Sequence, residues 1–343
     1  MYGHNIKRTQ KSKQMQYNLS NVSYPKPLIK WVGGKTQIIE KLMKKFPQQI
    51  NNYYEIFLGG GSILFAVLHL KRLGLIQIDG KIRAYDLNSL LITFYKTVQA
   101  KPNELYGEVQ KIVKEYNSIE DEESVQKTTN VEKSDPPTKK STKISEKDSK
   151  CSKENYYYWS RKLFNDLCNV ANPDENTKLK ISAYLLFLNK TCFRGLYREG
   201  PNGFNVPYGN YKKPEVINKE HLMEIHELIQ DVEFECCDFE ISLNREFKTN
   251  DFVYLDPPYA PENKTSFVNY TENGFDLGKH IKLFDLCHEL TNQKIKFIMN
   301  NADVDAVVHR FSTHEYKLES LACKRTINSK NPESKTMEVI IMN

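Results

Sequence analysis

The chain has 343 residues, of which 39% are hydrophobic and 27% are charged, and its formal net charge is +6. This length suits one large α/β domain with an insertion, or two domains. The sequence excludes a membrane-spanning or secreted protein, since no apolar run approaches the roughly 20 residues of a span and the N-terminus lacks a signal peptide's apolar core. The seven cysteines form no C-x-x-C pair, which favours reduced thiols in an intracellular protein and predicts no metal site.

The basic residues are unevenly distributed along the chain. Seven Lys and Arg side chains precede Glu40, the first acidic residue, and another basic group lies within residues 324–330. Residues 1–24 are polar and unpatterned, so we predict a mobile basic tail there. A locally basic surface suits a polyanionic partner, because phosphate contacts depend on nearby Lys and Arg. A solvated tail without a partner explains the same charges equally well.

The first patterned stretch is a glycine turn followed by a helix. Gly33-Gly34 permits a tight backbone turn, and apolar residues recur at helical spacing over residues 38–43. Trp31 and Lys35 flank the turn, where they can offer a ring face and a cation to a small ligand. The glycine spacing is not that of a P-loop, and a surface turn explains this stretch alone more simply.

A strand, a glycine loop and a helix start follow in residues 53–68. The loop carries Gly59 and Gly61 after Phe57, in an F-x-G-x-G spacing. In α/β folds this arrangement brings backbone N–H groups against a nucleotide-like ligand. A second expected strand ends at Asp86, and an acid at that position typically accepts ribose hydroxyl hydrogen bonds. We interpret the pair as a ligand site, with a structural turn as the alternative.

The middle of the chain alternates helical patterns with an insertion of low complexity. Residues 88–116 show helical spacing, and helical patterns resume over residues 156–168 and 179–188. Residues 117–153 have no aromatic side chain and many Lys, Glu, Ser and Thr. Such a composition cannot bury enough apolar surface to order the backbone. We therefore predict a disordered insertion between helices.

A hairpin is predicted over residues 190–209, around the turn at Pro201-Asn202-Gly203. Cations, amides and aromatic rings lie on both sides of this turn. These residue types suit contacts with phosphates and base edges, whereas a hairpin that covers its own core is the alternative. The candidate nucleic-acid-binding residues are Lys190, Arg194, Tyr197, Arg198, Asn202, Asn205 and Tyr208.

The last third of the chain alternates helical and strand patterns. Because strands and helices alternate at both ends of the chain, we expect an α/β fold with a mainly parallel sheet. One strand ends at Asp238-Phe239, another acid at a strand end. The expected helices cover residues 219–230 and 276–292, and the expected strands cover residues 232–236, 252–255, 296–299 and 337–342.

Asp256-Pro257-Pro258-Tyr259 directly follows the apolar strand over residues 252–255. Ligands of α/β sheets bind at this carboxyl edge. Prolines cannot continue a strand's ladder, so the carbonyls before each ring stay free as acceptors. The result is a rigid corner with a carboxylate, spare carbonyls and a flat ring, which suits an amino group on a planar heterocycle. A strand that ends in a proline turn with a capping Asp is the plainer alternative.

Taken together, these motifs resemble those of the Dam-type DNA adenine-N6 methyltransferases (D12 class, alpha group). The resemblance is spread over most of residues 28–343, and the motifs are specific as a set rather than singly. The matching blocks are Trp31–Lys35, Phe57–Gly61, Asp86–Asn88, Lys190–Gly209, Asp256–Tyr259 with Phe275, and Arg325–Asn343.

The resemblance implies a methyltransferase-type, Rossmann-like α/β fold, with a mostly parallel sheet and an inserted helical and β-hairpin target-recognition domain. The catalytic domain is expected in residues 25–100 and 215–343, and the recognition domain in residues 101–214. S-adenosylmethionine is the implied methyl donor. By the family match, its site comprises Trp31, Lys35, Phe57, Gly59, Gly61, Asp86, Asp238, Phe239 and Asp256.

The implied activity is site-specific methylation of adenine N6 on a base flipped out of duplex DNA. Asp256, Pro257, Pro258 and Tyr259 are the expected catalytic residues. Cytosine-C5 methylation would need a nucleophilic Cys, usually after Pro, and none of the seven cysteines follows a Pro. A GATC-like target is implied by the family. Arg194 stands where related hairpins often carry Asn, however, and Arg favours guanine or phosphate.

Two other classes of function stay open from the sequence. One is a methyltransferase acting on RNA adenine or protein glutamine, and Asp256 argues against the glutamine version, whose tetrapeptide usually opens with Asn. The other is a catalytically silent DNA-binding protein, against which the glycine loop and Asp86 argue. The expected partner is double-stranded DNA, with a cognate restriction endonuclease as an open option. We expect a monomer or a weak dimer in the cytoplasm.

Overall fold

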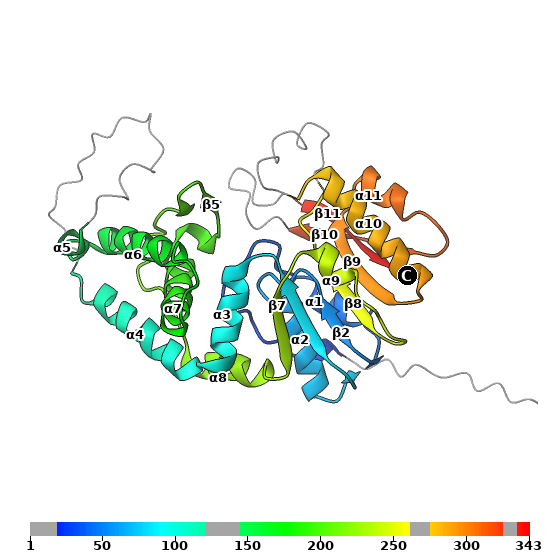
Figure 1. Ribbon diagram of the computed structural model, residues 1–343, viewed down its shortest axis with the longest axis horizontal. Coiled ribbons are helices and arrows are strands. Elements are labelled where there is room, and N and C mark those ends of the chain that lie inside the picture. The colour runs from blue at the N-terminus through cyan, green and yellow to red at the C-terminus, as the bar shows by residue number, and fades with distance from the viewer. Residues whose placement is uncertain (1–18, 121–144, 261–274, 325–334) are drawn as a thin grey trace, which may run out of the picture.

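The computed structural model describes residues 19–120, 145–260, 275–324 and 335–343. Its centre is a seven-stranded sheet with the order β10-β11-β9-β8-β2-β4-β7 (Figure 1). The pairs from β9 to β7 are parallel, whereas β11 is antiparallel to both β9 and β10. The predicted mostly parallel sheet is therefore confirmed. The strands are β2 (Tyr53–Glu55), β4 (Ile82–Asp86), β7 (Val232–Cys236), β8 (Phe252–Leu255), β9 (Lys296–Ala302), β10 (Lys317–Lys324) and β11 (Lys335–Met342).

Both faces of the sheet are buried, as the sequence of its central strand requires. All four residues of β8 are buried, and successive side chains of a strand point to opposite faces. Phe252 and Tyr254 accordingly belong to one hydrophobic cluster, and Val253 and Leu255 belong to another. A continuous apolar run is typical of a parallel strand that is covered on both sides.

Helices cover each face of this sheet. On the face of Phe252 lie α1 (Ile39–Met43), α2 (Ser62–Arg72) and α3 (Ser89–Ala100), whose buried apolar residues share its cluster. The other face is covered by α9 (Phe239–Leu243), α10 (Leu277–Asn292) and α11 (Asp305–Arg310). In Figure 1 these last three helices lie together on the right of the molecule. The carboxyl edge of the sheet, where the ligand site is predicted, therefore lies between two layers of helices.

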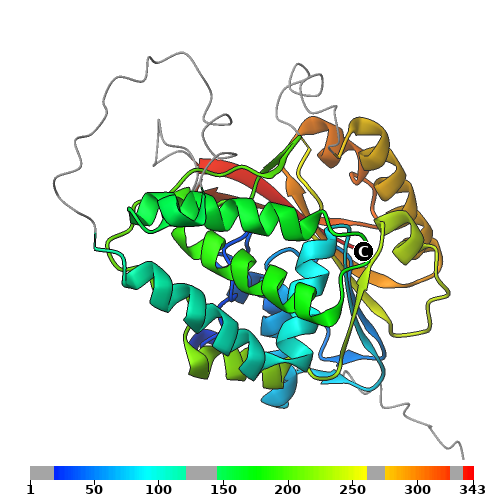
Figure 2. The same ribbon diagram turned by 60° about the vertical axis from the view of Figure 1, so that its left-hand side comes forward.

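A second group of helices extends from α3 away from the sheet (Figures 1 and 2). Helix α7 packs against α3, α4 and α6, and its Phe187 contacts the rings of Tyr116 on α4 and Tyr156 on α6. None of the helices in the described part of the chain is long and apolar enough to cross a membrane. The elements of this group are α4 (Pro102–Asn117), α5 (Glu146–Ser149), α6 (Lys153–Cys168), α7 (Glu175–Thr191), η3 (Phe193–Gly195), β5 (Glu199–Gly200), β6 (Gly203–Phe204) and α8 (Lys219–Leu228).

Short helices form in the described parts of two stretches that the sequence predicts to be unstructured. Of the predicted tail, residues 1–18 lie outside the described residues, but Leu19 is buried and starts a short 3-10 helix, η1 (Leu19–Asn21). Of the predicted insertion, residues 121–144 lie outside the described residues, but α5 forms at its C-terminal end. The Ser145 side chain accepts from Asp148 N–H and the Asp148 carboxylate accepts from Ser145 N–H, a capping box that stabilises a helix start in a polar sequence. The predicted domain boundaries stay predictions.

Candidate active site at the carboxyl edge of the sheet

The tetrapeptide lies at the carboxyl end of β8, against the loop that carries Lys35. The Lys35 Nζ is 2.7 Å from Asp256 Oδ2, and it also donates to the Gly33 carbonyl at 2.5 Å. Gly33 adopts a φ of 84°, a left-handed conformation that favours glycine and turns the backbone toward the ammonium. The two side chains are 4% and 17% exposed. The structure thus shows a direct ion pair between two residues that the family match implies for one cofactor site.

The Asp256 carboxylate is held at one oxygen and left available at the other. Burial raises its pKa to about 6, while the Lys35 cation lowers the pKa and Glu338 raises it further. Oδ2 takes the Lys35 ammonium, whereas Oδ1 is buried and has no hydrogen-bond partner among the described residues. A buried acceptor without a partner is costly unless a ligand completes it. Oδ1 is therefore the natural acceptor for a bound donor.

Two contacts fix the Tyr259 side chain, and a third fixes the backbone after it. The Lys35 Nζ lies 4.9 Å from the centroid of its ring, and its hydroxyl donates to Glu338 Oε2 at 2.8 Å. The next residue is held as well, since the Ala260 N–H donates to Asn301 Oδ1 at 3.0 Å. The ring therefore stands beside the carboxylate in a defined orientation.

Both carboxylate oxygens of Asp86 accept backbone hydrogen bonds, one of them from the glycine loop. The Gly59 N–H donates to Oδ2 and the Asn88 N–H donates to Oδ1, each at 2.8 Å. Burial raises the pKa of Asp86, and these two bonds lower it. Gly61 has a φ of 73°, and a Cβ there would lie 3.0 Å from Phe65 Cζ, so the loop needs glycine at this point. A ribose contact for Asp86 stays a prediction.

Three phenylalanines line the edge beside the glycine loop. The Phe57 ring centroid is 5.9 Å from that of Phe239 and 5.8 Å from that of Phe275, and the last two are 5.3 Å apart. Asp238 caps α9, because its Oδ1 accepts from the Glu240 N–H at 2.9 Å. The structure brings Phe57 and Phe239 together as the family match implies, while a direct ligand contact of Asp238 stays a prediction.

Trp31 connects the glycine loop with the hairpin. Its ring stacks on Tyr197 with centroids 4.8 Å apart, and a Cβ on Gly59 would lie only 3.1 Å from Trp31 Cδ1. The Asn189 amide at the end of α7 adds a second connection, since it accepts from Lys30 N–H and donates to Lys30 O, each at 2.8 Å. The predicted cofactor and nucleic-acid residues therefore lie next to each other.

The hairpin candidates divide into exposed and partly buried side chains. Arg194 has a φ of 60°, and its guanidinium lies 5.2 Å from the exposed ring of Phe193. The Arg198 Nε donates to Asn205 Oδ1 at 2.7 Å. Among the candidates, Arg194, Arg198 and Asn202 are exposed, and Lys190, Tyr197, Asn205 and Tyr208 are partly buried.

Some of the partly buried hairpin candidates also have a role in the fold. The Tyr208 hydroxyl lies 2.6 Å from that of Tyr116 on α4, and burial lowers the pKa of Lys190, with the Lys30 cation lowering it further. The exposed ring of Phe193 was not among the candidates, because an isolated Phe in a sequence more often predicts core. Nucleic-acid contact by these side chains stays a prediction.

A family model described as D12 class N6 adenine-specific DNA methyltransferase matches residues 31–327. The chain belongs to this family. It is 31% identical over 328 residues to the Type II methyltransferase M.MjaIII of Methanocaldococcus jannaschii, covering 93% of this chain and 99% of that protein. It is 29% identical over 317 residues to a DNA adenine methylase of Haemophilus influenzae, covering 90% of each. It is also 26% identical over 323 residues to the Type II methyltransferase M1.LlaDCHI of Lactococcus lactis, covering 93% of this chain and 95% of that protein.

This D12-class enzyme is therefore an S-adenosylmethionine-dependent methyltransferase that acts on adenine N6 in DNA. The alternatives of another amino substrate or a silent DNA-binding protein are set aside. The residues at the sheet edge fit the cofactor, which combines a cationic sulfonium and ammonium with an aromatic adenosine. The edge offers the Asp256 carboxylate for the cationic groups, a loop with no side chain at Gly59 and Gly61, and the rings of Phe57 and Phe239.

One buried acid near Asp256 was not among the residues predicted for the site. Glu55 is 1% exposed at the end of β2, and burial raises its pKa to about 8, with Asp256 contributing in the same direction. Its Oε2 accepts from the Tyr53 hydroxyl at 2.7 Å. At neutral pH Glu55 is therefore largely protonated. An acid directly before an F-x-G-x-G loop was the available signal, but the sequence does not show which way its side chain points.

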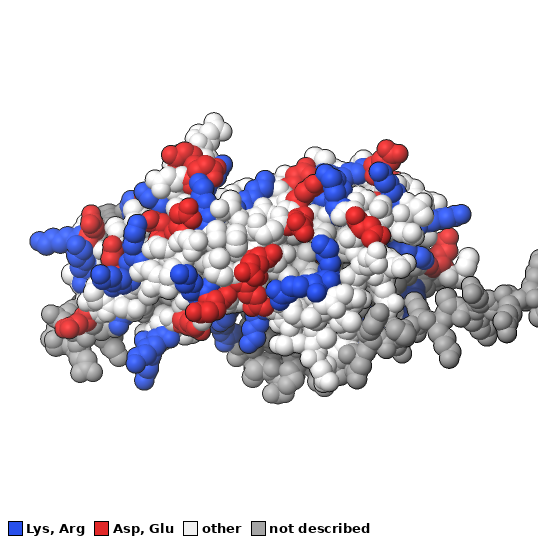
Figure 3. Space-filling view, turned by 90° about the horizontal axis from the view of Figure 1, so that it is seen from below, with Lys and Arg blue, Asp and Glu red and all other residues white. Residues whose placement is uncertain are grey.

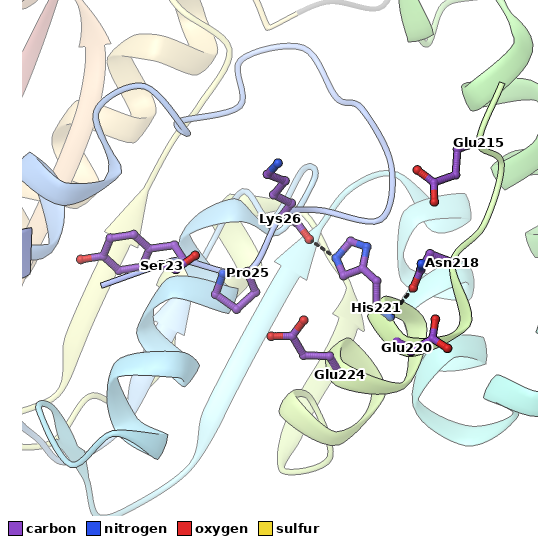
Figure 4. Close-up of a pocket in the computed structure, with 9 residues that line it drawn as sticks. Ser23, Pro25, Lys26, Glu215, Asn218, Glu220, His221 and Glu224 are labelled. Carbon is purple, nitrogen blue, oxygen red and sulfur yellow. Dashed lines mark hydrogen bonds between the residues drawn. The ribbon is translucent and has the colours of Figure 1, made fainter. Parts of the chain in front are cut away.

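A cavity of about 510 Å³ lies elsewhere, between residues 23–26 and the start of α8 (Figure 4). The His221 Nε2 lies 2.8 Å from the Lys26 carbonyl oxygen. Glu215, Glu220 and Glu224 line the same cavity, and none of the predicted site residues does. On the face shown in Figure 3, acidic and basic side chains are intermixed. Carboxylates repel a polyanion, so the sheet edge with its hairpin is the better candidate for the DNA side.

Proposed function

We propose that Asp256 and the Pro257 carbonyl accept the two N6 hydrogens of a flipped adenine, while Tyr259 stacks on its ring. The observation that carries the proposal is the asymmetry of the Asp256 carboxylate. Oδ2 is bound by Lys35 at 2.7 Å, and Oδ1 is buried without a partner among the described residues. One oxygen is thereby anchored, and the other is free to take a hydrogen bond from substrate.

The chemistry requires this kind of fixed acceptor. The adenine N6 lone pair is delocalised into the ring, so the nitrogen is a weak nucleophile. S-adenosylmethionine supplies the methyl group. As the new bond forms, positive charge develops on N6, and a preorganised carboxylate in a site of low polarity stabilises it. Lys35 holds that carboxylate in place, and the base stacks on the fixed Tyr259 ring in the orientation needed for methyl transfer.

We also propose that the glycine loop and its neighbours bind the cofactor. Asp86 already organises the loop through Gly59 N–H, and the side of the loop is lined by Trp31, Phe57 and Phe239. A flat aromatic ligand such as adenosine can pack against rings of this kind. Gly61, Lys35, Asp238 and Asp256 complete the proposed cofactor site.

The hairpin is proposed to read the DNA, in a GATC-like site. Arg194 and Arg198 are exposed there, and Arg contacts either guanine edges or phosphates. Asn202 and Asn205 offer amides that suit adenine edges, while Lys190, Tyr197 and Tyr208 support the hairpin from its partly buried side. The Arg at position 194 is the residue on which the target sequence most depends.

Methyl transfer to duplex DNA, followed by sequencing of the modified adenines, tests this function. Wild type should modify adenine within one sequence context, and Asp256→Ala should abolish the modification. Asp231→Ala is a matched control, because Asp231 is 80% exposed and lies at the surface, 3.5 Å from the Lys71 ammonium. Unchanged activity in Asp256→Ala would disprove the proposed mechanism.

We further propose a restriction endonuclease as a functional partner. Two relatives are named Type II methyltransferases, and a modification enzyme of that type protects sites from a cognate nuclease. A monomer or a weak dimer is proposed as the working state. The compartment that holds its DNA substrate, the cytoplasm, is the proposed location.

A further inference from the structure

Glu338 contacts the tetrapeptide from β11, a strand that is separated from β8 in the sheet by β9. It lies on β11, where it pairs opposite Ala302 of the neighbouring strand β9. Its Oε2 accepts a hydrogen bond from the Tyr259 hydroxyl at 2.8 Å. The C-terminal strand thereby touches the aromatic residue that follows the two prolines.

This hydrogen bond restricts the rotation of the Tyr259 side chain, which the two prolines leave free. Pro257 and Pro258 fix the backbone before Tyr259, but the side chain of Tyr259 can still rotate about its own bonds. A hydrogen bond at the far end of the ring restricts both its swing and its tilt. Burial raises the pKa of Tyr259, so its hydroxyl keeps the proton that it donates. Hydroxyl bonds to a carboxylate are shorter and stronger than neutral ones.

The carboxylate at position 338 also carries an electrostatic cost. Glu338 raises the pKa of Asp256, which disfavours the ionised form of the proposed catalytic acid. The Lys35 ammonium offsets this repulsion, since it lies 2.7 Å from Asp256 Oδ2 and 4.9 Å from the Tyr259 ring centroid. A negative charge so close to Asp256 needs a compensating benefit, and the bond to Tyr259 is the contact that the structure shows.

We propose that Glu338 is a positioning residue, which fixes the Tyr259 ring through its hydroxyl so that the flipped adenine stacks in the orientation needed for transfer. The proposal rests on the stacking role given to Tyr259 in the proposed function. Glu338 itself touches neither the base nor the cofactor in this scheme. Its effect on the reaction must therefore pass through the Tyr259 hydroxyl.

A double-mutant cycle on the full chain tests this dependence. Glu338→Ala and Tyr259→Phe should each lower kcat about tenfold, as expected for the loss of one charge-assisted bond, with little change in the KM for DNA. The double variant should be no slower than either single variant. Glu338→Gln keeps an acceptor oxygen and should restore most of the rate. Multiplicative losses in the double variant, or a Gln variant as slow as the Ala variant, would overturn the proposal.

Fluorescence of 2-aminopurine in place of the target adenine reports on the stacking of the flipped base. A purely structural role of Glu338 would leave this emission unchanged. Stacking on Tyr259 quenches the flipped base, so Glu338→Ala should raise its emission while the melting temperature stays near wild type. Glu319→Ala is the matched control, because Glu319 on the adjacent strand β10 pairs with Lys45 instead, and it should leave emission and kcat unchanged. Tyr259→Ala separates the two proposals. If that variant is unaffected, the stacking role itself fails; if it is impaired and Glu338→Ala is not, only the positioning role fails.

Discussion

The tetrapeptide and the hairpin lie on the same side of the enzyme but are held in opposite ways. Asp256 and Tyr259 are tied by an ion pair and by a phenol–carboxylate bond to segments distant in the sequence. The hairpin strands β5 and β6 have two residues each, and Arg194 and Arg198 project into solvent. Methyl transfer needs one fixed geometry, whereas the DNA reading proposed for the hairpin would use exposed side chains that can be exchanged at low cost to the fold. This contrast predicts where mutations should remove activity and where they should redirect it.

The largest loss of activity is expected from a mutation in the rigidly held tetrapeptide. Asp256→Asn keeps the shape of the side chain but removes its charge, so charge developing on N6 loses its stabilisation. We expect kcat to fall by about 10³-fold, a typical cost of removing a preorganised electrostatic group. Methyl transfer to duplex DNA measures the loss, with Asp231→Asn as the control. A variant within tenfold of wild type would show that the charge of Asp256 is not needed.

Replacing Lys35 should move the pH dependence of the reaction. In the proposed mechanism the active form of Asp256 is the carboxylate, so activity should be present above its pKa of about 6 and lost as the pH falls through that value. Lys35 lowers this pKa, and Lys35→Met should therefore shift the acid limb of the pH–rate profile to higher pH. At pH 7 we expect a loss of roughly 10–100-fold, with partial recovery at pH 8.5. An unshifted acid limb would contradict the assignment.

At the hairpin, mutation should change selectivity more than rate. Arg194→Asn exchanges a donor fork suited to guanine for an amide suited to adenine. We expect the ratio of methylation between preferred and altered sites to change about tenfold, in line with 1–3 kcal/mol for one base contact. Methylation of a randomised duplex library, read by sequencing, measures the ratio. Equal and uniform weakening at all sites would instead place Arg194 on the phosphates.

The smallest effect on activity, but a clear one on stability, is expected at Glu55. Its folded pKa of about 8 lies well above the ordinary pKa of a Glu side chain, so the folded state holds a proton that the unfolded state has lost at neutral pH. Stability should therefore fall as the pH rises from about 4.5 to 8. Glu55→Gln keeps an acceptor for the Tyr53 hydroxyl and should remove this loss, raising stability at pH 8.5 by roughly 2–4 kcal/mol. Urea unfolding at pH 5 and pH 8.5 tests it, and an unchanged pH dependence would contradict the burial argument.

Some structural features missed by the sequence analysis have clear physical origins. Helix α5 forms in a polar stretch because of a local capping box at Ser145. A prediction from average composition does not detect such a local signal. Strand β10 is paired in full with β11, although no strand was expected over residues 317–324. Each case depends on local contacts that average composition does not represent.

The sequence by itself determined most of the strands and helices around the site, the glycine loop and the rigid corner at Asp256. These follow from short-range physics, because apolar periodicity, glycine freedom and proline geometry act within a few residues. Only the tertiary structure decided that Lys35 pairs with Asp256, that Glu338 holds Tyr259 and that Glu55 lies buried below them. These contacts join strands and loops that are far apart in sequence, and they depend on sheet order and on which face each side chain takes. A single sequence fixes neither in advance, since a shift of one residue in a strand reverses every face.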